Sequence, residues 1–408
     1  MWSKSVLSIN TALVFALALG MPLTEVSAKE KARGFIVKTK NGLEVRTKDK
    51  AYSVKIGTRV QYDFNRFEDV INQTETATDS DSFFRRARIE IAGEIPDWSY
   101  KFSYNLTDSA SVDVLSVNYE GWGDMFEVML GQQKEGFGLE DTGSSKWITA
   151  VERSMPSNAF SVGKNLGIRL HGANDTFTYS VGVFEENFES NAHALDRAAT
   201  ARVVLRPIYK KKKTFHLGVG YTTREGQFEE LSARLGSRGG EERRANRIRA
   251  EYDRGAIADR STAWNLEFAA ILGRYHFMGE YFEGKLEGSG NAPDLKANGY
   301  YTQAGWVITG ESRRYKKSNA TFGEVSPKSR SGAWEIFTRF DVLDVSDSAT
   351  GRLTDIDGGR GQTLTLGLNW YVNQYVKVAA NYVYAKTERN FGGMDDGNAI
   401  AMRFQLTY

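Results

Sequence analysis

Long stretches of the chain alternate hydrophobic and polar residues at every second position. From residue 52 to residue 64, one set of alternate positions is aromatic or aliphatic and the other is charged, polar or glycine. The hydrophobic set is Tyr52, Val54, Ile56, Val60, Tyr62 and Phe64. The same alternation returns at residues 98–106, 363–370 and 400–408. Because successive side chains of a β-strand point to opposite faces, the pattern predicts strands with one hydrophobic and one polar face.

The kinds of hydrophobic residue favour a barrel in a membrane. Tyr and Trp concentrate at the ends of the predicted strands, as aromatic girdles do at the two membrane interfaces. Glycines fall on the polar face, which suits the wall of a lumen. A soluble exported β-sandwich is the alternative, but its hydrophobic face is mostly aliphatic and turned inward. We therefore predict an all-β fold, a transmembrane antiparallel β-barrel.

The number of strands follows from parity. Seventeen segments carry the strand pattern, whereas a single-chain bacterial barrel with both ends in the periplasm has an even number. Arg247–Tyr252 lies in a long basic run and lacks suitably placed turn residues, so we assign it to a loop. Sixteen strands remain: Ala51–Asn65, Phe83–Glu94, Trp98–Leu106, Asp113–Trp122, Met125–Gln132, Asn165–Gly172, Thr176–Phe184, Arg197–Pro207, Thr214–Thr223, Thr262–Leu272, Arg274–Gly284, Gly299–Thr309, Ala333–Leu343, Thr363–Tyr371, Val376–Lys386 and Asn398–Tyr408. This count puts Gly310–Gly332 on the periplasmic side despite its length.

The N-terminus has the pattern of a secretory signal peptide. Lys4 supplies positive charge, Ala12–Gly20 is apolar, and Val26–Ala28 offers small residues at a cleavage point. The apolar run is shorter than the roughly 20 residues that a spanning helix needs. We expect residues 1–28 to be removed, residues 29–50 to form a periplasmic N-terminal segment, and residues 51–408 to form the barrel.

Composition excludes several kinds of chemistry. The 408 residues include no cysteine, which rules out disulfides, thiol nucleophiles and cysteine-ligated metals. The 53 Lys and Arg nearly balance the 51 Asp and Glu, which argues against a polybasic surface for nucleic acid. The four histidines are scattered, and no zinc-protease, phosphate-loop or serine-elbow motif is present. We assign no enzyme activity, catalytic residue, metal or cofactor.

One stretch, Ser144–Ser154, breaks the alternation. Trp147 and Val151 lie one helical turn apart, among hydroxyls and charges. The stretch belongs to the third external loop, Gln132–Lys164. The lumen of so wide a barrel is an aqueous channel, so a partly helical loop can fold inward and narrow it. This reading projects Ser144, Ser145, Lys146 and Arg153 into the lumen; an ordinary surface loop is the alternative.

Five segments carry a resemblance to a known family. They are "FFRRARIEIAG", "GFGLEDTGSSKWITAVERS", "DLKANGYYTQAGWVITGESRRYKK", "GAWEIFTRFD" and "TLGLNWYVNQYVKVAANYVYAKT". The chain after the signal peptide resembles the phosphate-selective porins O and P of Gram-negative outer membranes over nearly its whole length. The resemblance implies a trimeric barrel of about sixteen strands with an inward third loop. It also implies passive uptake of phosphate or pyrophosphate along a ladder of arginines.

The resemblance assigns roles to individual residues. It implies constriction arginines at Arg59, Arg86 and Arg153, phosphate-binding hydroxyls at Ser144 and Ser145, and a neighbouring aspartate at Asp113. Alternation by itself also places Arg59 and Arg86 on the polar face. Where the family has a constriction lysine, this chain has Asp141. We expect Asp141 to pair with an arginine and to weaken phosphate binding.

The fifth external loop is rich in arginine. Its candidate residues for an anion funnel are Arg234, Arg238, Arg243, Arg244, Arg247 and Arg249. Glutamates in the same loop offset part of this charge, so a solvated charged loop explains the composition about as well.

These observations predict an anion-selective diffusion porin for phosphate or related oxyanions. A guanidinium group matches two oxygens of a phosphate, and conduction requires several weak sites. The expected partners are the oxyanion, outer-membrane lipid and two further copies in a homotrimer, with no nucleic acid. The alternatives are a weakly selective general porin and a plugged barrel that serves as an adhesin or structural protein.

Overall fold

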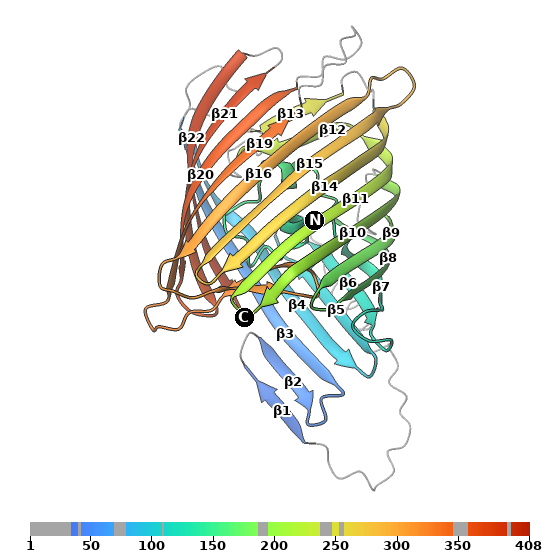
Figure 1. Cartoon of the computed structure of the whole chain (residues 1–408), viewed down its shortest axis with the longest axis vertical. Coiled ribbons are helices and arrows are strands. Elements are labelled where there is room, and N and C mark those ends of the chain that lie inside the picture. Colours follow the sequence, from blue (N-terminus) through green and yellow to red (C-terminus); the bar gives the residue numbers. More distant parts are fainter. Residues whose placement is uncertain are drawn as a thin grey trace, which may run out of the picture.

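The computed structural model describes residues 34–39, 42–68, 79–107, 110–186, 195–236, 247–252, 257–345, 358–389 and 393–408. Sixteen of the described strands form a closed antiparallel barrel (Figure 1). They are β3 (Ser53–Glu68), β4 (Asp79–Ile95), β5 (Trp98–Asn105), β6 (Ser111–Tyr119), β7 (Glu127–Lys134), β8 (Lys164–Ala173), β9 (Phe177–Glu185), β10 (Leu195–Lys210), β11 (Lys213–Phe228), β14 (Ala258–Leu272), β15 (Tyr275–Gly288), β16 (Leu295–Val307), β19 (Ala333–Asp344), β20 (Gly359–Tyr371), β21 (Val376–Arg389) and β22 (Gly393–Thr407). Each pairs with its neighbour in chain order, and β22 pairs with β3 to close the ring. The predicted sixteen-stranded barrel is confirmed.

Two hairpins lie outside this ring. Arg247–Glu251 forms β13, which pairs with β12 (Glu230–Arg234) in a separate two-stranded sheet. Its exclusion from the barrel is therefore correct, but the prediction of a loop without a strand is wrong, because its partner is local. A second hairpin, β17 (Arg313–Lys316) and β18 (Thr321–Val325), occupies the long connection between β16 and β19.

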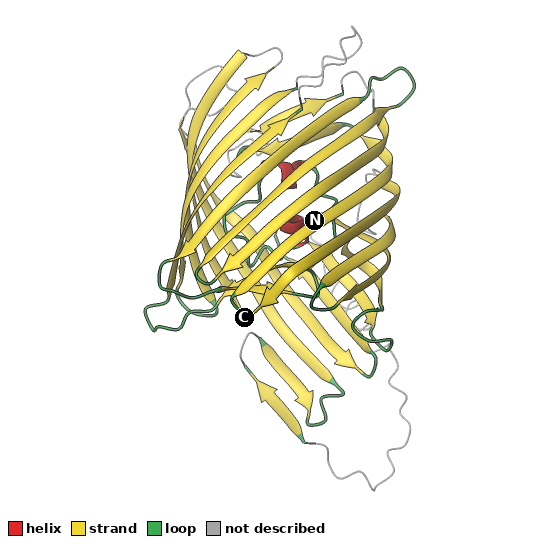
Figure 2. Ribbon diagram, in the orientation of Figure 1, coloured by secondary structure: helices red, strands yellow, loops and turns green. Residues whose placement is uncertain are grey.

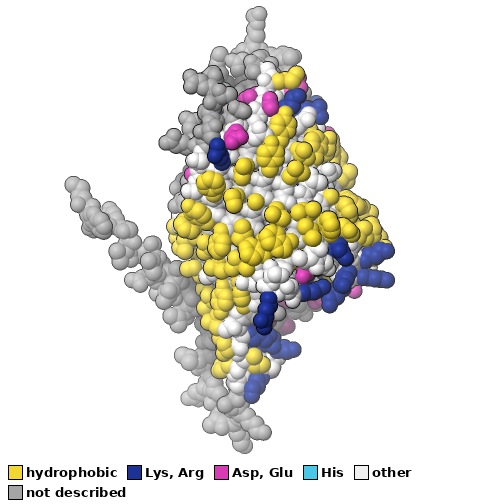
Figure 3. Space-filling view, turned by 90° about the vertical axis from the view of Figure 1, so that its left-hand side faces the viewer, with side chains coloured by type: hydrophobic (Ala, Val, Ile, Leu, Met, Phe, Trp, Pro, Cys, Tyr) yellow, Lys and Arg dark blue, Asp and Glu magenta, His cyan; other side chains and the backbone are white. Residues whose placement is uncertain are grey.

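The barrel strands expose their hydrophobic face and bury their polar face. On β22, alternate residues from Ile400 to Leu406 are large, hydrophobic and 37–47% exposed. Between them, Arg403 and Gln405 are buried inside the ring. Figure 3 shows the resulting band of hydrophobic side chains on one side of the molecule. This is the distribution expected of a barrel that faces lipid. None of the described helices is long and apolar enough to cross a membrane.

Two β-bulges redirect charged side chains. Across β5 and β6, Ser103 pairs with Val114 and Tyr104 pairs with Val112, so Asp113 has no register partner. Strict alternation with the exposed Leu115 would turn Asp113 outward, whereas the bulge brings it into the lumen. A bulge between β3 and β4 leaves Arg85 as the extra residue in the same way.

Inserts fill one half of the lumen. The segment 135–163 carries the helices α2 (Leu139–Thr142) and α3 (Met155–Ala159), which lie inside the ring in Figure 2. One continuous hydrophobic cluster joins this segment to the β12–β13 hairpin and to barrel strands β14, β15, β16, β19 and β21. The space beside β3–β8 stays open, as described below.

A short hairpin precedes the barrel. β1 (Phe35–Lys38) and β2 (Leu43–Thr47) pair with each other, and β2 pairs with the start of β3. The hairpin therefore continues the sheet beyond the ring (Figure 1). The signal peptide predicted at residues 1–28 lies outside the described residues, and the periplasmic location of residues 29–50 stays a prediction.

We expect deletion of Tyr408 to impair barrel assembly, because this residue completes the seam between the two ends of the barrel. Its backbone N–H donates to Thr58 O at 3.1 Å, and Thr58 N–H donates to its carbonyl at 2.8 Å. The two lost bonds amount to about 1–3 kcal/mol. Folded yield, measured by the heat-dependent electrophoretic mobility of the barrel, should fall, while Tyr408→Phe should keep it. Normal yield after the deletion would contradict this role.

Candidate functional site

A cavity of about 1170 Å³ lies along the wall of β2–β8, beneath the inward segment 135–163. Twelve Lys and Arg side chains line it, against five Asp and Glu. The basic residues are Arg46, Lys50, Lys55, Arg59, Arg86, Arg88, Lys101, Lys134, Arg153, Lys164, Arg169 and Lys316. The acidic residues are Glu44, Glu90, Glu94, Asp113 and Asp141. The near-neutral chain thus concentrates positive charge at one place.

The far wall of the barrel holds the inward segment in position. The amide of Asn369 donates to Thr149 O at 2.9 Å, and Asn381 Oδ1 accepts from Val151 N–H at 2.7 Å. Arg403 donates to Val151 O at 2.5 Å, and Arg339 donates to Glu152 O at 2.8 Å. Side chains of β19–β22 therefore bind the backbone of the segment directly, so its position depends on the whole ring.

The β17–β18 hairpin supports the segment from the other direction. Arg313 donates hydrogen bonds to Trp147 O and Thr149 Oγ1, and it pairs with Glu335 of β19 at 3.4 Å. All of these groups are buried or nearly so. The long connection at residues 310–332 thus helps to hold the inward segment in place.

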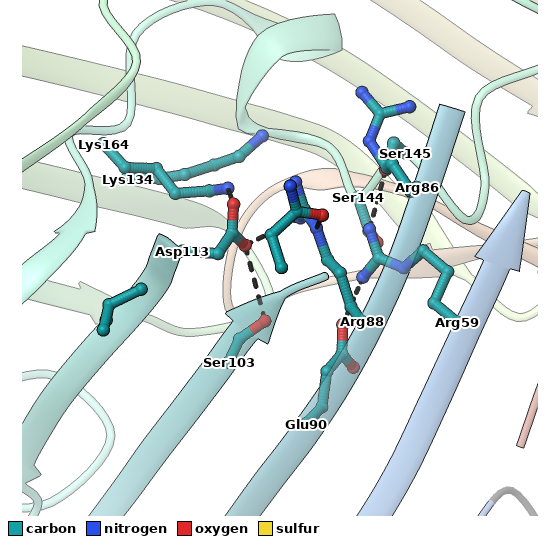
Figure 4. Close-up of polar contacts among 12 residues, drawn as sticks. Arg59, Arg86, Arg88, Glu90, Ser103, Asp113, Lys134, Ser144, Ser145 and Lys164 are labelled. Carbon is teal, nitrogen blue, oxygen red and sulfur yellow. Dashed lines mark hydrogen bonds and ion pairs between the residues drawn. The ribbon is translucent and has the colours of Figure 1, made fainter. Parts of the chain in front are cut away.

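Three arginines on β3 and β4 face the cavity (Figure 4). Arg59 donates to Ser145 Oγ at 2.7 Å and pairs with Glu90 at 2.5 Å. Arg88 donates to Asp113 at 2.7 Å, and Arg86 donates to the side-chain oxygen of Gln61 at 3.0 Å. We call Arg59, Arg86 and Arg88 the arginine wall. Arg59 and Arg88 each pair with a carboxylate, whereas the described hydrogen bond of Arg86 goes to a neutral amide.

Asp141 lies beside Arg153, as the sequence led us to expect. Its carboxylate oxygen is 3.2 Å from the Arg153 guanidinium, and its side chain is buried. Arg153 also donates to the carbonyls of Glu140, Asp141 and Gly143 at 3.2, 3.2 and 3.3 Å. Arg153 therefore both lines the cavity and holds the turn that carries Ser144 and Ser145.

The two serines line the cavity, whereas Lys146 does not line it but binds Glu90, which does. Ser144 and Ser145 line the cavity, and Ser144 Oγ accepts a hydrogen bond from Lys146 N–H at 3.3 Å. Lys146 Nζ donates to Glu90 at 2.5 Å. Burial lowers the pKa of the Lys146 ammonium group to about 8; the positive charge of Arg59 also lowers this pKa, while Glu90 opposes both effects.

Several cavity residues were missed by the sequence reasoning. Arg88 and Glu90 follow Arg86 at alternate positions on one face, so strict alternation within "RRARIE" could have found them. Arg85 was missed because the bulge that turns it inward is invisible in the pattern. It pairs with Glu152 at 2.7 Å and so also binds the inward segment. Lys134 and Lys164, at the two ends of that segment, were missed as well.

The structure describes three of the six arginines of the predicted anion funnel. Arg234, Arg247 and Arg249 lie on the β12–β13 hairpin, on the face opposite its buried apolar residues. Arg249 pairs with Glu251 at 3.0 Å, and Arg247 lies 3.7 Å from Glu230. None of these three lines the cavity that the described residues enclose. Arg238, Arg243 and Arg244 lie outside the described residues, so the funnel stays a prediction.

The described residues hold no cluster of three or more Asp, Glu or His side chains arranged for a metal ion. The cavity itself is lined by guanidinium, ammonium and hydroxyl donors. Such donors can replace part of the hydration shell of an anion.

Comparisons with known proteins agree with this geometry. The family model of the phosphate-selective porins O and P matches residues 54–408. Porin O of Pseudomonas aeruginosa is 33% identical over an alignment 433 positions long, which covers 97% of this chain and 98% of that protein. Two solved structures share the fold at low identity. The trimer form of OmpT of Vibrio cholerae has a TM-score of 0.55 at 12% identity, covering 88% of this chain and 100% of that one. The anion-selective porin from Comamonas acidovorans has a TM-score of 0.54 at 11% identity, with the same two coverages.

We expect the ion selectivity of the channel to change as the pH rises through the pKa of Lys146. Above pH of about 8 this ammonium group loses its proton, so one positive charge beside Glu90 at the edge of the cavity is lost. Reversal potentials measured under a KCl gradient between pH 7 and pH 9.5 should shift toward lower chloride preference. The Lys146→Arg variant keeps its charge over this range and should show a smaller shift. Equal shifts in both proteins would assign the titration to another group.

Proposed function

The chain belongs to the phosphate-selective porin O and P family, and from this premise we propose that it passes phosphate or a related oxyanion through the constriction between the arginine wall and the inward segment. It is a β-barrel porin of the Gram-negative outer membrane. The observation that carries the proposal is the excess of basic side chains around the cavity, twelve against five. In a chain of formal net charge +2, this excess is local.

The residue types suit an oxyanion that loses part of its hydration. Guanidinium groups at Arg59, Arg86 and Arg88 offer planar pairs of donors, and Ser144 and Ser145 add neutral donors. Nearby carboxylates reduce the net attraction. Each of Glu90, Asp113 and Asp141 is paired with at least one cation. Because a single tight site would trap the ion, this partial neutralisation favours release and hence conduction.

We propose that the barrel works as a homotrimer in outer-membrane lipid. Its exposed hydrophobic face fits a lipid environment, and OmpT of Vibrio cholerae, which shares the fold, has a trimer form. Transport needs no cofactor in this scheme, because the ion follows its own gradient.

Single-channel recording in planar lipid bilayers tests the proposal. Under a KCl gradient the reversal potential should report chloride preference, and added phosphate should reduce the chloride current. A conducting channel without ion preference would instead indicate a general porin. Conductance near zero would indicate a plugged barrel with an adhesive or structural role.

We expect Arg86→Gln to weaken block by phosphate. Two unit charges about 4 Å apart interact by roughly 4 kcal/mol at an effective dielectric constant near 20. If a third of that survives hydration, the half-blocking phosphate concentration rises about tenfold. Arg314→Gln is the matched control, since Arg314 is exposed on β17, pairs with Glu324 and does not line the cavity. Equal block in wild type and Arg86→Gln would place the anion site elsewhere.

We expect Asp141→Asn to strengthen block by phosphate. The substitution keeps the shape of the side chain but removes the charge that neutralises Arg153. The half-blocking phosphate concentration should fall roughly threefold to tenfold, since each tenfold step is about 1.4 kcal/mol. Asp175→Asn, an exposed site on the turn between β8 and β9, serves as control. Unchanged block would mean that Asp141 does not act on the permeating anion.

A further inference from the structure

Two lysines face each other where the chain enters and leaves the inward segment. Lys134 ends β7, Lys164 begins β8, and the two are register partners across these antiparallel strands. Both side chains line the cavity. Directly opposed residues have Cβ atoms about 4.5–5.5 Å apart, and like charges in that arrangement destabilise a sheet. This pair therefore costs stability unless a negative charge lies close to both lysines.

Shared hydrogen-bond acceptors bring these lysines close to the arginines already described. Asp113 accepts from Arg88 at 2.7 Å and also binds Lys164, so the two cationic groups flank one carboxylate (Figure 4). Gly143 O accepts from Lys134 at 3.0 Å and from Arg153 at 3.3 Å. The lysines thus extend the positive charge of the arginine wall around the cavity to β7 and β8.

The two lysines differ in how far a carboxylate cancels their charge. Lys164 is bound to Asp113. The described hydrogen bonds of Lys134 go to the backbone carbonyls of Asp141 and Gly143, which are neutral. Glu135, the residue after Lys134, pairs with Arg224 and accepts a hydrogen bond from Thr200. No carboxylate is therefore among the hydrogen-bond acceptors described for Lys134.

We propose that Lys134 and Lys164 form a second cationic wall opposite the arginine wall, and that this wall sets the preference of the channel for divalent oxyanions over chloride. The inference rests on the proposed function and adds specificity residues to it. An oxyanion with two charges and four oxygens can accept from both walls at once. Chloride carries a single charge, so it gains less from the second wall. Lys134 contributes more than Lys164, because Asp113 pairs with Lys164, whereas only backbone carbonyls accept the described hydrogen bonds of Lys134.

The test measures block of the chloride current by inorganic phosphate and by sulfate, which stays divalent at neutral pH. Lys134→Gln should raise the half-blocking concentration of both anions about tenfold, and Lys164→Gln about threefold, steps of roughly 1.4 and 0.7 kcal/mol. Chloride conductance should fall in both variants, but by a smaller factor than the half-blocking concentrations rise. Lys134→Arg, which keeps the charge, should restore block by both anions.

Three results would overturn the second wall. The first is unchanged block in Lys134→Gln while Arg86→Gln still weakens block; the proposed function would then stand without it. The second is that Lys134→Gln loses chloride conductance and block to the same extent and that Lys134→Arg restores neither. Lys134 would then only support the loop carbonyls. The third is weaker block by phosphate with unchanged block by sulfate, which would exclude a preference based on charge. Failure of the proposed function itself would give a different result: the wild-type channel would show neither anion preference nor block by phosphate.

Discussion

Arg403 of β22 carries the contacts that hold the inward segment against the barrel. Its guanidinium forms two hydrogen bonds of 2.6 Å with Asp63 of β3, across the closing seam. It also donates to Val151 O at 2.5 Å and to Glu152 at 3.1 Å. Glu152 in turn binds Arg85, the bulge residue of β4. Breaking a buried ion network of this kind by removing one partner costs about 3–5 kcal/mol. The closing seam of the barrel, the inward segment and strand β4 of the cavity wall are therefore joined by one network of charged side chains.

This network answers a geometric problem. The width of a barrel follows from its number of strands, and sixteen strands leave an aqueous channel far wider than a small ion. Selectivity by contact requires a narrower passage. The chain narrows it by filling one side with the segment 135–163 and two hairpins, which share a hydrophobic cluster or hydrogen bonds with the wall. The open side is lined by β3–β8, and nine of the twelve cavity lysines and arginines lie on these strands or on the segment.

In the proposed function, the charges around the cavity suit the transit of an anion. Among the residues that line the cavity, like-charged residues stand opposite each other twice, at Arg59 with Arg88 and at Lys134 with Lys164. Such pairs are unfavourable in a sheet and become favourable when an anion lies between them. The carboxylates Glu90, Asp113 and Asp141 bind several of these cations and keep the empty passage stable. They also limit how tightly an anion is held, which a conducting pore requires.

Alternation along the sequence determined the all-β class, the sixteen barrel strands and the inward direction of Arg59 and Arg86, because a strand has a fixed period of two. The same local rule fails for Asp113 and Arg85, since a bulge adds a residue and reverses the parity that follows it. Sequence also located the insert 132–164 by its broken alternation. Only the tertiary structure decided which residues share the cavity with it. Lys134, Lys164, Arg313 and Arg403 lie on different strands and hairpins. Arg313 and Arg403 bind the segment, and Lys134 and Lys164 line the cavity beside it, because ring closure and inward folding bring these parts together. Contacts between residues distant in the chain leave no periodic signal in it.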